Sequence, residues 1–514
     1  MASTLLKDLK GVLQFVSECD GYFPTSKCEV KTSVFGGLGV YAVCDLKEGE
    51  TLLQLPKSCV FSASNSSIAN LLVDGEIDGM LALIIAFIYE TSIFKGKSHW
   101  YPYLKSVRIT EGNELYLPPN LWDSHSKKAL TGSTLDTLHR GLDEEEEVQQ
   151  GYEIALNLAR QWNAELGWAI PEPYFNSFQH FVAVAYAISS RVFEIDNYHE
   201  SALVPVADLF NHKAHRDGPH VRFVSLYEVC SDCGEPGMCR HLVAEAAQER
   251  EDEAAAVREQ HPDDGVIDTQ MIEELERQED ETAEEQEEGL VKNVHPDECV
   301  DIVVTRDVPK GQEILNSYGE LSNALLLARY GFCVEDNPWD MVYLGNDLLK
   351  LLKDKDLKIR AKWWDSMGYE LYQNWCALNK DGDDEEEGNK DEYDSDDSEE
   401  EEQERERSWL PEVCVDHRGS PSSSMKALLN LLALSRKDWH KLRAIEKDVE
   451  SLGNKIGILD KHFNRRSSKI LLRLITARQR KLSSPSEVRN PSARLMLQSE
   501  HNILQKVQEN LRKF

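Results

Sequence analysis

Four polar side chains that could bind a ligand or handle a proton follow two apolar runs of the chain. Asp208, Asn211 and His212 come after one run, and Tyr318 follows the other. An amide offers a donor and an acceptor together, which suits a ligand with an amino group beside a carboxylate. A tyrosine hydroxyl can orient an incoming amine and accept weak C–H···O contacts from a polarised methyl group. Taken alone, such a histidine is more often a satisfied core residue, and such a tyrosine an ordinary strand residue.

A glycine-rich turn near the N-terminus is a second candidate for contact with a ligand. Gly37, Leu38 and Gly39 interrupt an apolar segment, which predicts a strand, a tight turn and a second strand over 30–43. Glycine allows positive φ and lets another molecule approach the backbone closely. An ordinary β-hairpin explains the turn equally well by itself, so a ligand role depends on the motifs that accompany it.

The order of these motifs along the chain resembles that of the SET-domain methyltransferases. The glycine turn comes first and the pair Asn211-His212 second; an NSYG run with Tyr318 and a YGF run with Tyr330 and Phe332 come last. The nearest resemblance is to the split-SET branch, which includes the Rubisco large-subunit and ribosomal-protein lysine methyltransferases. It covers about residues 10–345 in pieces, and several motifs in the right order are specific where one alone is weak.

The resemblance implies roles for individual residues. Tyr318 matches the catalytic tyrosine of the family, and Asp208 and Tyr330 match residues that line the channel of the substrate lysine. Arg191 would pair with the carboxylate of the cofactor, although an arginine that bonds the last carbonyls of its own helix is an equal alternative. The family often has an acid where this chain has Gly36. Contacts to S-adenosylmethionine are implied for Gly37, Leu38, Gly39, Arg191, Asn211, His212, Tyr318 and Phe332.

The fold implied by the resemblance is α+β. A SET-domain β-fold with a pseudoknot is split by a helical insertion and followed by an all-α substrate-binding domain. The expected segments are 1–65 and 196–345 for the two SET parts, 66–195 for the insertion and 346–514 for the C-terminal domain. The periodicity of apolar residues predicts helices over 4–19, 78–92, 147–168, 174–193, 346–369, 424–452, 459–476 and 491–514, and strands over 51–55, 203–210, 221–229 and 299–305.

Most of the formal charge of −34 lies in two stretches. Residues 245–289 carry a net charge of −16, and residues 381–407 carry −14. We expect the first stretch to be a solvated insert within the second SET part, and the second to be a loop of the C-terminal domain. Their sign argues against free nucleic acid as a ligand.

Cys230, Cys233, Cys239 and His241 form a short cluster of metal-ligand types. The Cys-x-x-Cys half is typical of a zinc knuckle, and four such ligands could hold one tetrahedral Zn²⁺. The Cys-x-His half does not have the spacing of a standard zinc finger. A loop with free thiols is the alternative, and both interpretations stay open here.

Cysteine usage and the N-terminus indicate an intracellular protein. The 11 cysteines are odd in number, and no apolar signal segment opens the chain. No apolar run reaches the ~18 residues of a membrane span. We therefore expect free thiols and a monomer without a membrane partner, in the nucleus or the cytoplasm.

The predicted function is S-adenosylmethionine-dependent protein-lysine N-methylation. A ribosomal protein is the preferred substrate, and a histone or another nuclear protein is the second. Methylation of a protein histidine is a further alternative, since one branch of the family methylates histidine. A catalytically silent SET scaffold that binds a partner through the acidic stretches is the alternative of another class. The intact Tyr318, Asn211, His212 and Arg191 favour the enzyme, whereas Gly36 favours the scaffold.

Overall fold

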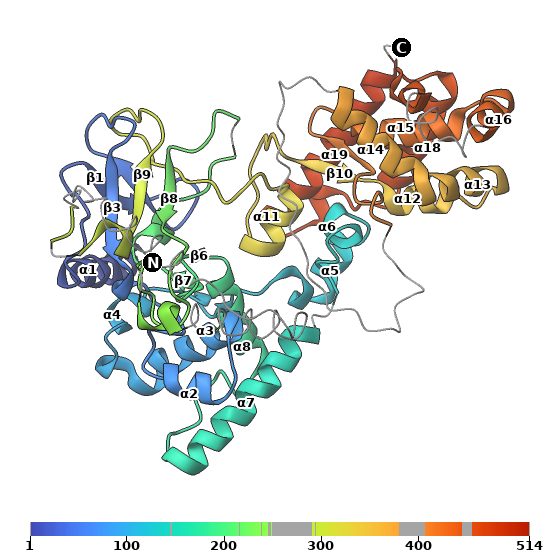
Figure 1. The fold of residues 1–514 in the computed structure, drawn as a ribbon. Coiled ribbons are helices and arrows are strands. Elements are labelled where there is room, and N and C mark those ends of the chain that lie inside the picture. Colours follow the sequence, from blue (N-terminus) through green and yellow to red (C-terminus); the bar gives the residue numbers. More distant parts are fainter. Residues whose placement is uncertain are drawn as a thin grey trace, which may run out of the picture. The chain divides into compact units, whose positions relative to one another are not determined.

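A computed structural model gives the structure of this protein (Figure 1). Apart from Gln248 and Arg407, the two acidic stretches 245–289 and 381–407 lie outside the described residues. The structure describes residues 2–143, 146–214, 216–237, 239–244, 248, 290–292, 294–379, 407–444 and 455–512.

The chain divides into two compact units, and each is built from separate pieces of sequence. The second unit takes a short piece, 117–144, from the segment that we expected to be one helical insertion. The four segments expected from sequence therefore differ from this division and stay a prediction. The first unit contains 1–116, 145–213 and 217–318, and the second contains 117–144, 214–216 and 319–514.

An antiparallel sheet of three strands forms the centre of the first unit. Its order is β3 (Thr51–Pro56), β9 (Cys299–Val304) and β8 (Val221–Ser225). The apolar side chains of β3 and β9 are buried in one core with the helices of this unit. The strand predicted over 221–229 ends at Ser225. Beyond it the backbone turns away from the sheet, and the Leu226 carbonyl accepts a hydrogen bond from Lys57 Nζ.

The glycine turn joins the two strands of a hairpin, as the sequence predicts. The strands are β1 (Cys28–Thr32) and β2 (Leu38–Ala42), and Gly36 and Gly37 lie between them with φ of +99° and +65°. The other edge of β2 runs beside residues 311–314, where Ile314 N donates to the Val40 carbonyl at 2.7 Å. The NSYG run thus begins from a segment that pairs with the glycine hairpin.

Helices cover the sheet of the first unit. They are α1 (Ala2–Glu18), α2 (Ala69–Asp74), α3 (Gly79–Tyr89), α4 (Tyr101–Leu104), α7 (Glu146–Leu166) and α8 (Phe178–Ser189). Helix α3 packs against α7 and α8 (Figure 1). All its side chains from Ala82 to Tyr89 are buried. A short hairpin of β4 (Thr110–Glu111) and β5 (Glu114–Leu115) completes this part.

The helical stretch Gly79–Lys97 passes a membrane-span test of length and composition, with a mean hydropathy of 1.4. The expectation that no apolar run reaches this length does not hold for it. Half of the stretch is buried inside the protein, as in the core helix of a soluble domain. Its apolar character is therefore explained by its packing against α7, α8 and strand β7.

The strand predicted over 203–210 is wrong beyond its first residue. A short hairpin of β6 (Val192–Glu194) and β7 (Ser201–Leu203) forms, and the chain then leaves the extended conformation. Val206 adopts a φ of +73°, which no strand allows, and Ala207–Leu209 form a 3-10 turn. Positive φ is rare for a β-branched residue, so the sequence gives no sign of this turn.

The second unit is mostly helical. It also contains a two-stranded sheet of β10 (Met341–Tyr343) and β11 (Cys414–Asp416), which we did not expect in an all-α domain. Its helices are α5 (Ser124–Leu130), α6 (Thr134–Thr137), α11 (Asn323–Tyr330), α12 (Gly345–Leu351), α13 (Lys355–Trp363), α14 (Tyr369–Asn379), α15 (Ser423–Ala433), α16 (Arg436–Ala444), α18 (Arg465–Gln479) and α19 (Pro491–Arg512).

Capping residues explain where the helices of this unit begin. The helix predicted over 346–369 is broken, because the Asp354 carboxylate accepts from Asp356 N and Leu357 N and starts α13. The Ser322 hydroxyl accepts from Leu325 N and starts α11. Such a cap satisfies a backbone donor that the first turn leaves free.

Segment 117–144 is held in the second unit by buried polar contacts. Arg478 on α18 donates to the Gly132 carbonyl, to Thr137 Oγ1 and to the Tyr343 carbonyl. Glu500 on α19 accepts from Thr134 N at 2.6 Å. Arg478 is fully buried and Glu500 nearly so. Because buried donors and acceptors need partners, these bonds fix the segment to α18 and α19.

Candidate functional site

The two polar motifs meet within the first unit. Residues 211–213 and 316 pair in parallel, with Asn316 N donating to the Asn211 carbonyl at 2.9 Å and Lys213 N to the Asn316 carbonyl at 2.8 Å. His212 and Asn316 are both buried. Two segments about a hundred residues apart thus present their polar ends at one place, as the family pattern implies.

Tyr318 is positioned by His212 and Phe210. Its backbone N–H donates to His212 Nδ1 at 3.0 Å, and its hydroxyl donates to the Phe210 carbonyl at 3.3 Å. The centroids of the Tyr318 and His212 rings lie 5.2 Å apart. Burial lowers the pKa of His212 to about 4, so the ring is neutral at physiological pH. A neutral ring can accept through Nδ1, which keeps the Tyr318 backbone in place.

Asn211 connects the glycine turn to an acid that sequence analysis missed. Its Nδ2 donates to the Leu38 carbonyl at 3.0 Å and to Glu313 Oε1 at 2.7 Å. A Cβ at Gly39 would lie only 2.1 Å from Glu313 Oε1. Gly39 is therefore required by the close approach of this carboxylate, more than by the shape of the turn.

The Glu313 carboxylate accepts hydrogen bonds from three side chains. Besides Asn211, it accepts from Ser33 Oγ at 3.0 Å and from the Tyr41 hydroxyl at 2.8 Å. It lies beside the glycine turn, where the sequence has Gly36 in place of the family's acid. Sequence analysis does not identify Glu313, because only the pairing of 311–314 with β2 brings this acid to the glycine turn.

Asp208 lies in the 3-10 turn and interacts with Tyr103 and Arg191. It accepts from the Tyr103 hydroxyl at 3.2 Å. Burial raises the pKa of Asp208 to about 6, against the opposing effects of the Arg191 charge and the hydrogen bond from Tyr103. Asp208 is thus a carboxyl group that titrates close to neutrality, which is typical of groups in functional sites.

Arg191 follows α8 and bonds back to it. Its Nη1 donates to the Ala187 carbonyl and to Ser190 Oγ, both at 2.9 Å. This is the helix-terminal arrangement that we weighed as the alternative to a cofactor contact. Its charge also acts on Asp208, so Arg191 contributes to the electrostatics around the 3-10 turn.

The remaining predicted residues do not all fall in the same unit. Gly37 is exposed and Leu38 is half-buried, both next to Gly39. Tyr330 and Phe332 belong to the second unit. Tyr330 is the last residue of α11, Phe332 follows Gly331, and the two ring centroids lie 6.1 Å apart. Burial raises the pKa of Tyr330.

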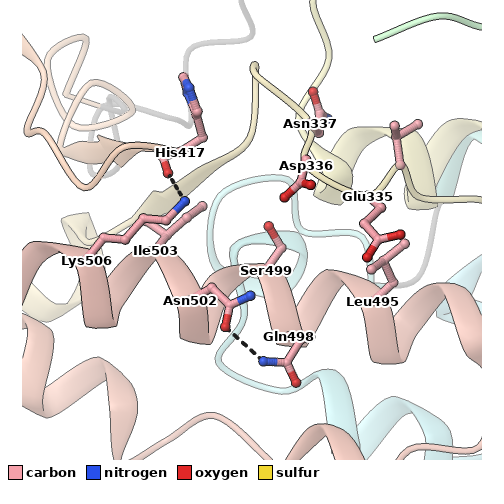
Figure 2. A pocket seen from close by; sticks show the side chains of 11 residues that line it. Glu335, Asp336, Asn337, His417, Leu495, Gln498, Ser499, Asn502, Ile503 and Lys506 are labelled. Carbon is pink, nitrogen blue, oxygen red and sulfur yellow. Dashed lines mark hydrogen bonds between the residues drawn. The ribbon is translucent and has the colours of Figure 1, made fainter. Parts of the chain in front are cut away.

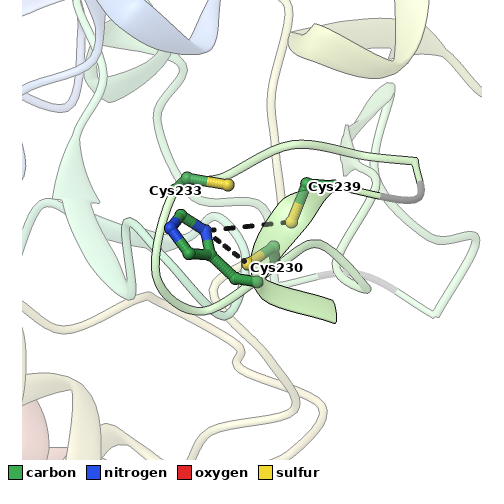
Figure 3. A group of neighbouring side chains, drawn as sticks. Cys230, Cys233 and Cys239 are labelled. Atoms are coloured by element: carbon green, nitrogen blue, oxygen red, sulfur yellow. Dashed lines mark hydrogen bonds between the residues drawn. The ribbon is translucent and has the colours of Figure 1, made fainter. Parts of the chain in front are cut away.

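The four residues of the Cys/His cluster come together after β8. Their ligand atoms all lie within 4.8 Å of one another. The side chains of Cys230, Cys233 and Cys239 converge in Figure 3. His241 Nδ1 lies 3.7 Å from Cys230 Sγ and 3.8 Å from Cys239 Sγ. Cys230 is buried, whereas Cys233 is exposed.

A pocket of about 160 Å³ opens in the second unit between α19 and the loop after α11 (Figure 2). Carboxyl, amide and hydroxyl groups line it, among them Asp336, Asn337 and Ser499. It contains none of the residues predicted for the site. Its volume is below the ~300–1,000 Å³ of pockets that enclose a small-molecule ligand, and it therefore does not suit a nucleoside cofactor.

Known proteins with similar sequences include two ribosomal lysine N-methyltransferases. The chain is 44% identical to ribosomal lysine N-methyltransferase 3 of Saccharomyces cerevisiae, over 99% of this chain and 100% of that protein. It is 22% identical to ribosomal lysine N-methyltransferase 4 of Schizosaccharomyces pombe, over 67% and 71%. It is 25% identical to protein SET DOMAIN GROUP 40 of Arabidopsis thaliana, over 60% and 52%. No protein-family model matches the chain.

Solved structures agree on the fold. The SET domain of LSMT bound to lysine and AdoHcy superposes with a TM-score of 0.52 at 14% identity, over 99% of this chain and 91% of that chain. Rubisco LSMT bound to sinefungin and monomethyllysine gives a TM-score of 0.51, over 98% and 92%. These similarities confirm the predicted SET-domain α+β fold.

Proposed function

Because the chain belongs to the SET-domain family of protein-lysine N-methyltransferases, we propose that it methylates a lysine of a ribosomal protein with S-adenosylmethionine as methyl donor. The observation that carries the proposal is the identity of 44% with a ribosomal lysine N-methyltransferase over the full length of both chains. A second, more distant relative also acts on a ribosomal lysine by its name.

The groups around the glycine turn suit the amino-acid end of S-adenosylmethionine. The Glu313 carboxylate is an acceptor for an ammonium group, and the Asn211 amide lies beside it. Charge-assisted hydrogen bonds of this kind are among the stronger ones in proteins. We assign the contacts to this cofactor within the first unit to Glu313 and to Gly37, Leu38, Gly39, Arg191, Asn211, His212 and Tyr318. A contact from Phe332 of the second unit stays a prediction from the resemblance.

Tyr318 has the surroundings of a residue that orients a nucleophile. When bound, S-adenosylmethionine supplies a methyl group on a positively charged sulfur; the neutral lysine amine would attack the methyl carbon in line, so that the C–S bond breaks and the thioether leaves. Such a displacement needs alignment more than acid or base catalysis. The Tyr318 hydroxyl, fixed by the Phe210 carbonyl, would accept weak contacts from the methyl group. Asp208 is the proposed channel residue of the first unit, and Tyr330 of the second unit stays a prediction from the resemblance. A channel with few waters lowers the pKa of the lysine.

Mass spectrometry of ribosomal proteins tests the proposal. Purified protein is incubated with ribosomal proteins and isotope-labelled S-adenosylmethionine, with Tyr318→Phe in parallel. Tyr227→Phe is the matched control, because the Tyr227 side chain is exposed. We expect label on a lysine with the wild type and the control, and a large loss with Tyr318→Phe.

Other outcomes separate the alternatives. Label on a histone or another nuclear protein, and on no ribosomal protein, would reject the ribosomal substrate but keep the enzyme. Label on a histidine would reject lysine as the acceptor of the methyl group. If no protein is labelled and Tyr318→Phe behaves like the wild type in every assay, the chain is a SET-fold scaffold.

A further inference from the structure

We propose that Cys230, Cys233, Cys239 and His241 bind one Zn²⁺ ion that fixes the segment after β8 to the loop between β6 and β7. The role is structural, because four protein ligands leave no open position on a tetrahedral ion. The inference concerns a part of the first unit that the proposed methyl transfer does not use. It therefore stands or falls independently of the substrate.

The distances in the cluster fit a tetrahedral ion. Zn–S bonds of about 2.3 Å and Zn–N bonds of about 2.0 Å place a sulfur and a nitrogen roughly 3.6 Å apart at the tetrahedral angle. His241 Nδ1 lies 3.7 Å from Cys230 Sγ and 3.8 Å from Cys239 Sγ. No two of the four ligand atoms lie more than 4.8 Å apart. The four atoms therefore surround a space of the size that Zn²⁺ needs.

Local backbone hydrogen bonds bring the four ligands close together in the chain's turns. Gly234 N donates to the Cys230 carbonyl at 2.8 Å, and Cys230 N donates to the Glu235 carbonyl at 3.0 Å. Gly234 has a φ of +73°, a conformation that glycine adopts without strain. Val243 N donates to the Cys239 carbonyl at 3.0 Å in the helical turn that carries His241.

A loop with free thiols accounts poorly for this convergence. Thiols are weak donors and weak acceptors, so three of them gain little from meeting around one imidazole. All cysteines of the chain are free in the structure. A soft ion that binds three thiolates and an imidazole supplies the missing reason for the arrangement.

The cluster lies against the loop between β6 and β7. A Cβ at Gly234 would come within 2.9 Å of the Tyr198 ring, so this turn and that ring are in close contact. Asn197 N donates to the Tyr227 carbonyl at 3.2 Å. The segment before the cluster and the loop 195–200 are thereby joined at two places.

A buried ion pair strengthens the same junction. Lys57 Nζ donates to the Leu226 carbonyl at 2.6 Å and lies 2.8 Å from Asp196 Oδ2. Both side chains are at least 95% buried. The Asp196 carboxylate also accepts from His199 N at 2.7 Å. The cluster thus lies beside a loop that is held by a buried ion pair.

The loop 195–200 leads to the proposed site at both of its ends. Strand β6 begins directly after Arg191, and β7 leads into the turn that carries Asp208. Residues 226–228 and 231–233 are exposed and have no core of their own. Metal binding can supply the folding free energy that such a segment lacks. We therefore expect the ion to order this junction and, through it, the β6–β7 hairpin.

Metal analysis of the full-length protein is the first test. Protein purified without chelator should contain about one zinc per chain by plasma mass spectrometry. Cys233→Ser and Cys239→Ser should lose the metal, and Cys44→Ser, which changes a half-buried cysteine outside the cluster, should keep it. His241→Cys should also keep it, because four thiolates hold zinc in the same geometry. Wild-type protein that binds no zinc even when zinc is supplied, or variants that bind as much, would overturn the proposal.

Thermal unfolding and hydrogen exchange test the structural role. A chelator should lower the unfolding midpoint of the wild type and of Cys44→Ser, and should not change that of Cys233→Ser. In the wild type it should also speed amide exchange in residues 195–200. If the serine variants do not fold, His241→Cys, which keeps four ligands, still shows by its midpoint with and without chelator how much the bound metal contributes. Zinc that leaves without any change in midpoint or exchange would reject the role in fixing the junction.

Discussion

At the scale of single residues, the sequence indicates which side chains act, but not all of their partners. Asn211, His212 and Tyr318 could be expected to meet, because family motifs in order imply it. The place of Glu313 in the site could not be predicted, because its bond to Ser33 joins residues 280 positions apart. A carboxylate that holds a ligand has no local pattern of its own, whereas a glycine turn or an Asn-His pair does.

Glu313 is expected to matter for binding of S-adenosylmethionine more than for folding. Glu313→Gln removes the charge that would attract the ammonium group, and charge-assisted hydrogen bonds contribute about 1.5–3 kcal/mol. Affinity for the cofactor should fall roughly 10- to 100-fold, as measured by isothermal titration calorimetry. Glu29→Gln, which changes an exposed acid on β1, is the control. Equal affinities of the two variants would exclude Glu313 from the cofactor site.

Asp208 should give the protein a distinctive dependence of stability on pH. Its pKa in the folded protein is about 6, above the usual value of 3.8. The folded state therefore binds a proton that the unfolded chain has released, so this group favours folding below about pH 4 and the benefit is lost as pH rises through about 6.

The variant Asp208→Asn isolates this effect. The amide cannot ionise, so the variant does not lose the stability that the wild type loses as Asp208 ionises. The midpoint of the variant minus that of the wild type should therefore rise between pH 4 and pH 6 and then stay level. Buried His212 titrates in both proteins, so its opposite contribution cancels in the comparison. A difference between the two midpoints that is the same at every pH would contradict a raised pKa of Asp208.

At the scale of helices and strands, the periodicity of apolar residues predicts that an element forms better than it predicts the residues at which the element begins and ends. Strands β3 and β9 and helices α1, α3, α7 and α8 form close to the predicted ranges. The strand over 203–210 fails at Val206 because its positive φ depends on the surrounding packing. The helix over 346–369 breaks because the cap at Asp354 was not recognised. Both errors arise where one residue sets the backbone direction.

The ion pair of Arg478 on α18 and Asp347 on α12 should be important for the second unit. Both side chains are fully buried, and Arg478 also bonds α6 and β10. Arg478→Met should cost about 3–5 kcal/mol of unfolding free energy, because it leaves a buried acid and buried carbonyls with fewer partners. Arg436→Met breaks an exposed pair with Asp356 and should cost less than about 1 kcal/mol.

Chemical denaturation of the two variants gives the comparison. Similar midpoints for Arg478→Met and Arg436→Met would mean that the buried pair contributes no more than a surface pair. Lys481 still pairs with Asp347 when Arg478 is replaced, so a variant of Asp347 combined with Arg478→Met should recover only a small part of the loss.

At the scale of the whole molecule, the resemblance predicts the SET-domain fold, but not how the sequence is shared between units. Segment 117–144 reads as part of the helical insertion, because only its neighbours along the chain are visible in the sequence. Its membership of the second unit depends on Arg478 and Glu500, whose partners no periodicity identifies.

A truncated chain that ends at residue 345 tests this division. Removal of 346–514 takes away the partners of 117–144, so the truncated protein should be cleaved within that segment by proteases that leave the full chain intact. Limited proteolysis followed by mass spectrometry locates the cuts. A truncated chain with the cleavage pattern of the full-length protein would show that 1–345 folds by itself.

The long-range bonds of 117–144 also bear on how the protein is made. Gly132 and Thr134 find their partners 346 and 366 residues later in the chain. At a synthesis rate of about 5–20 residues per second, these groups wait roughly 20–70 s on the ribosome before α18 and α19 emerge. During that time the apolar side chains of Leu130 and Leu135, buried in the finished protein, have no core to enter. The nascent chain therefore presents a site for chaperones until its last helix is complete.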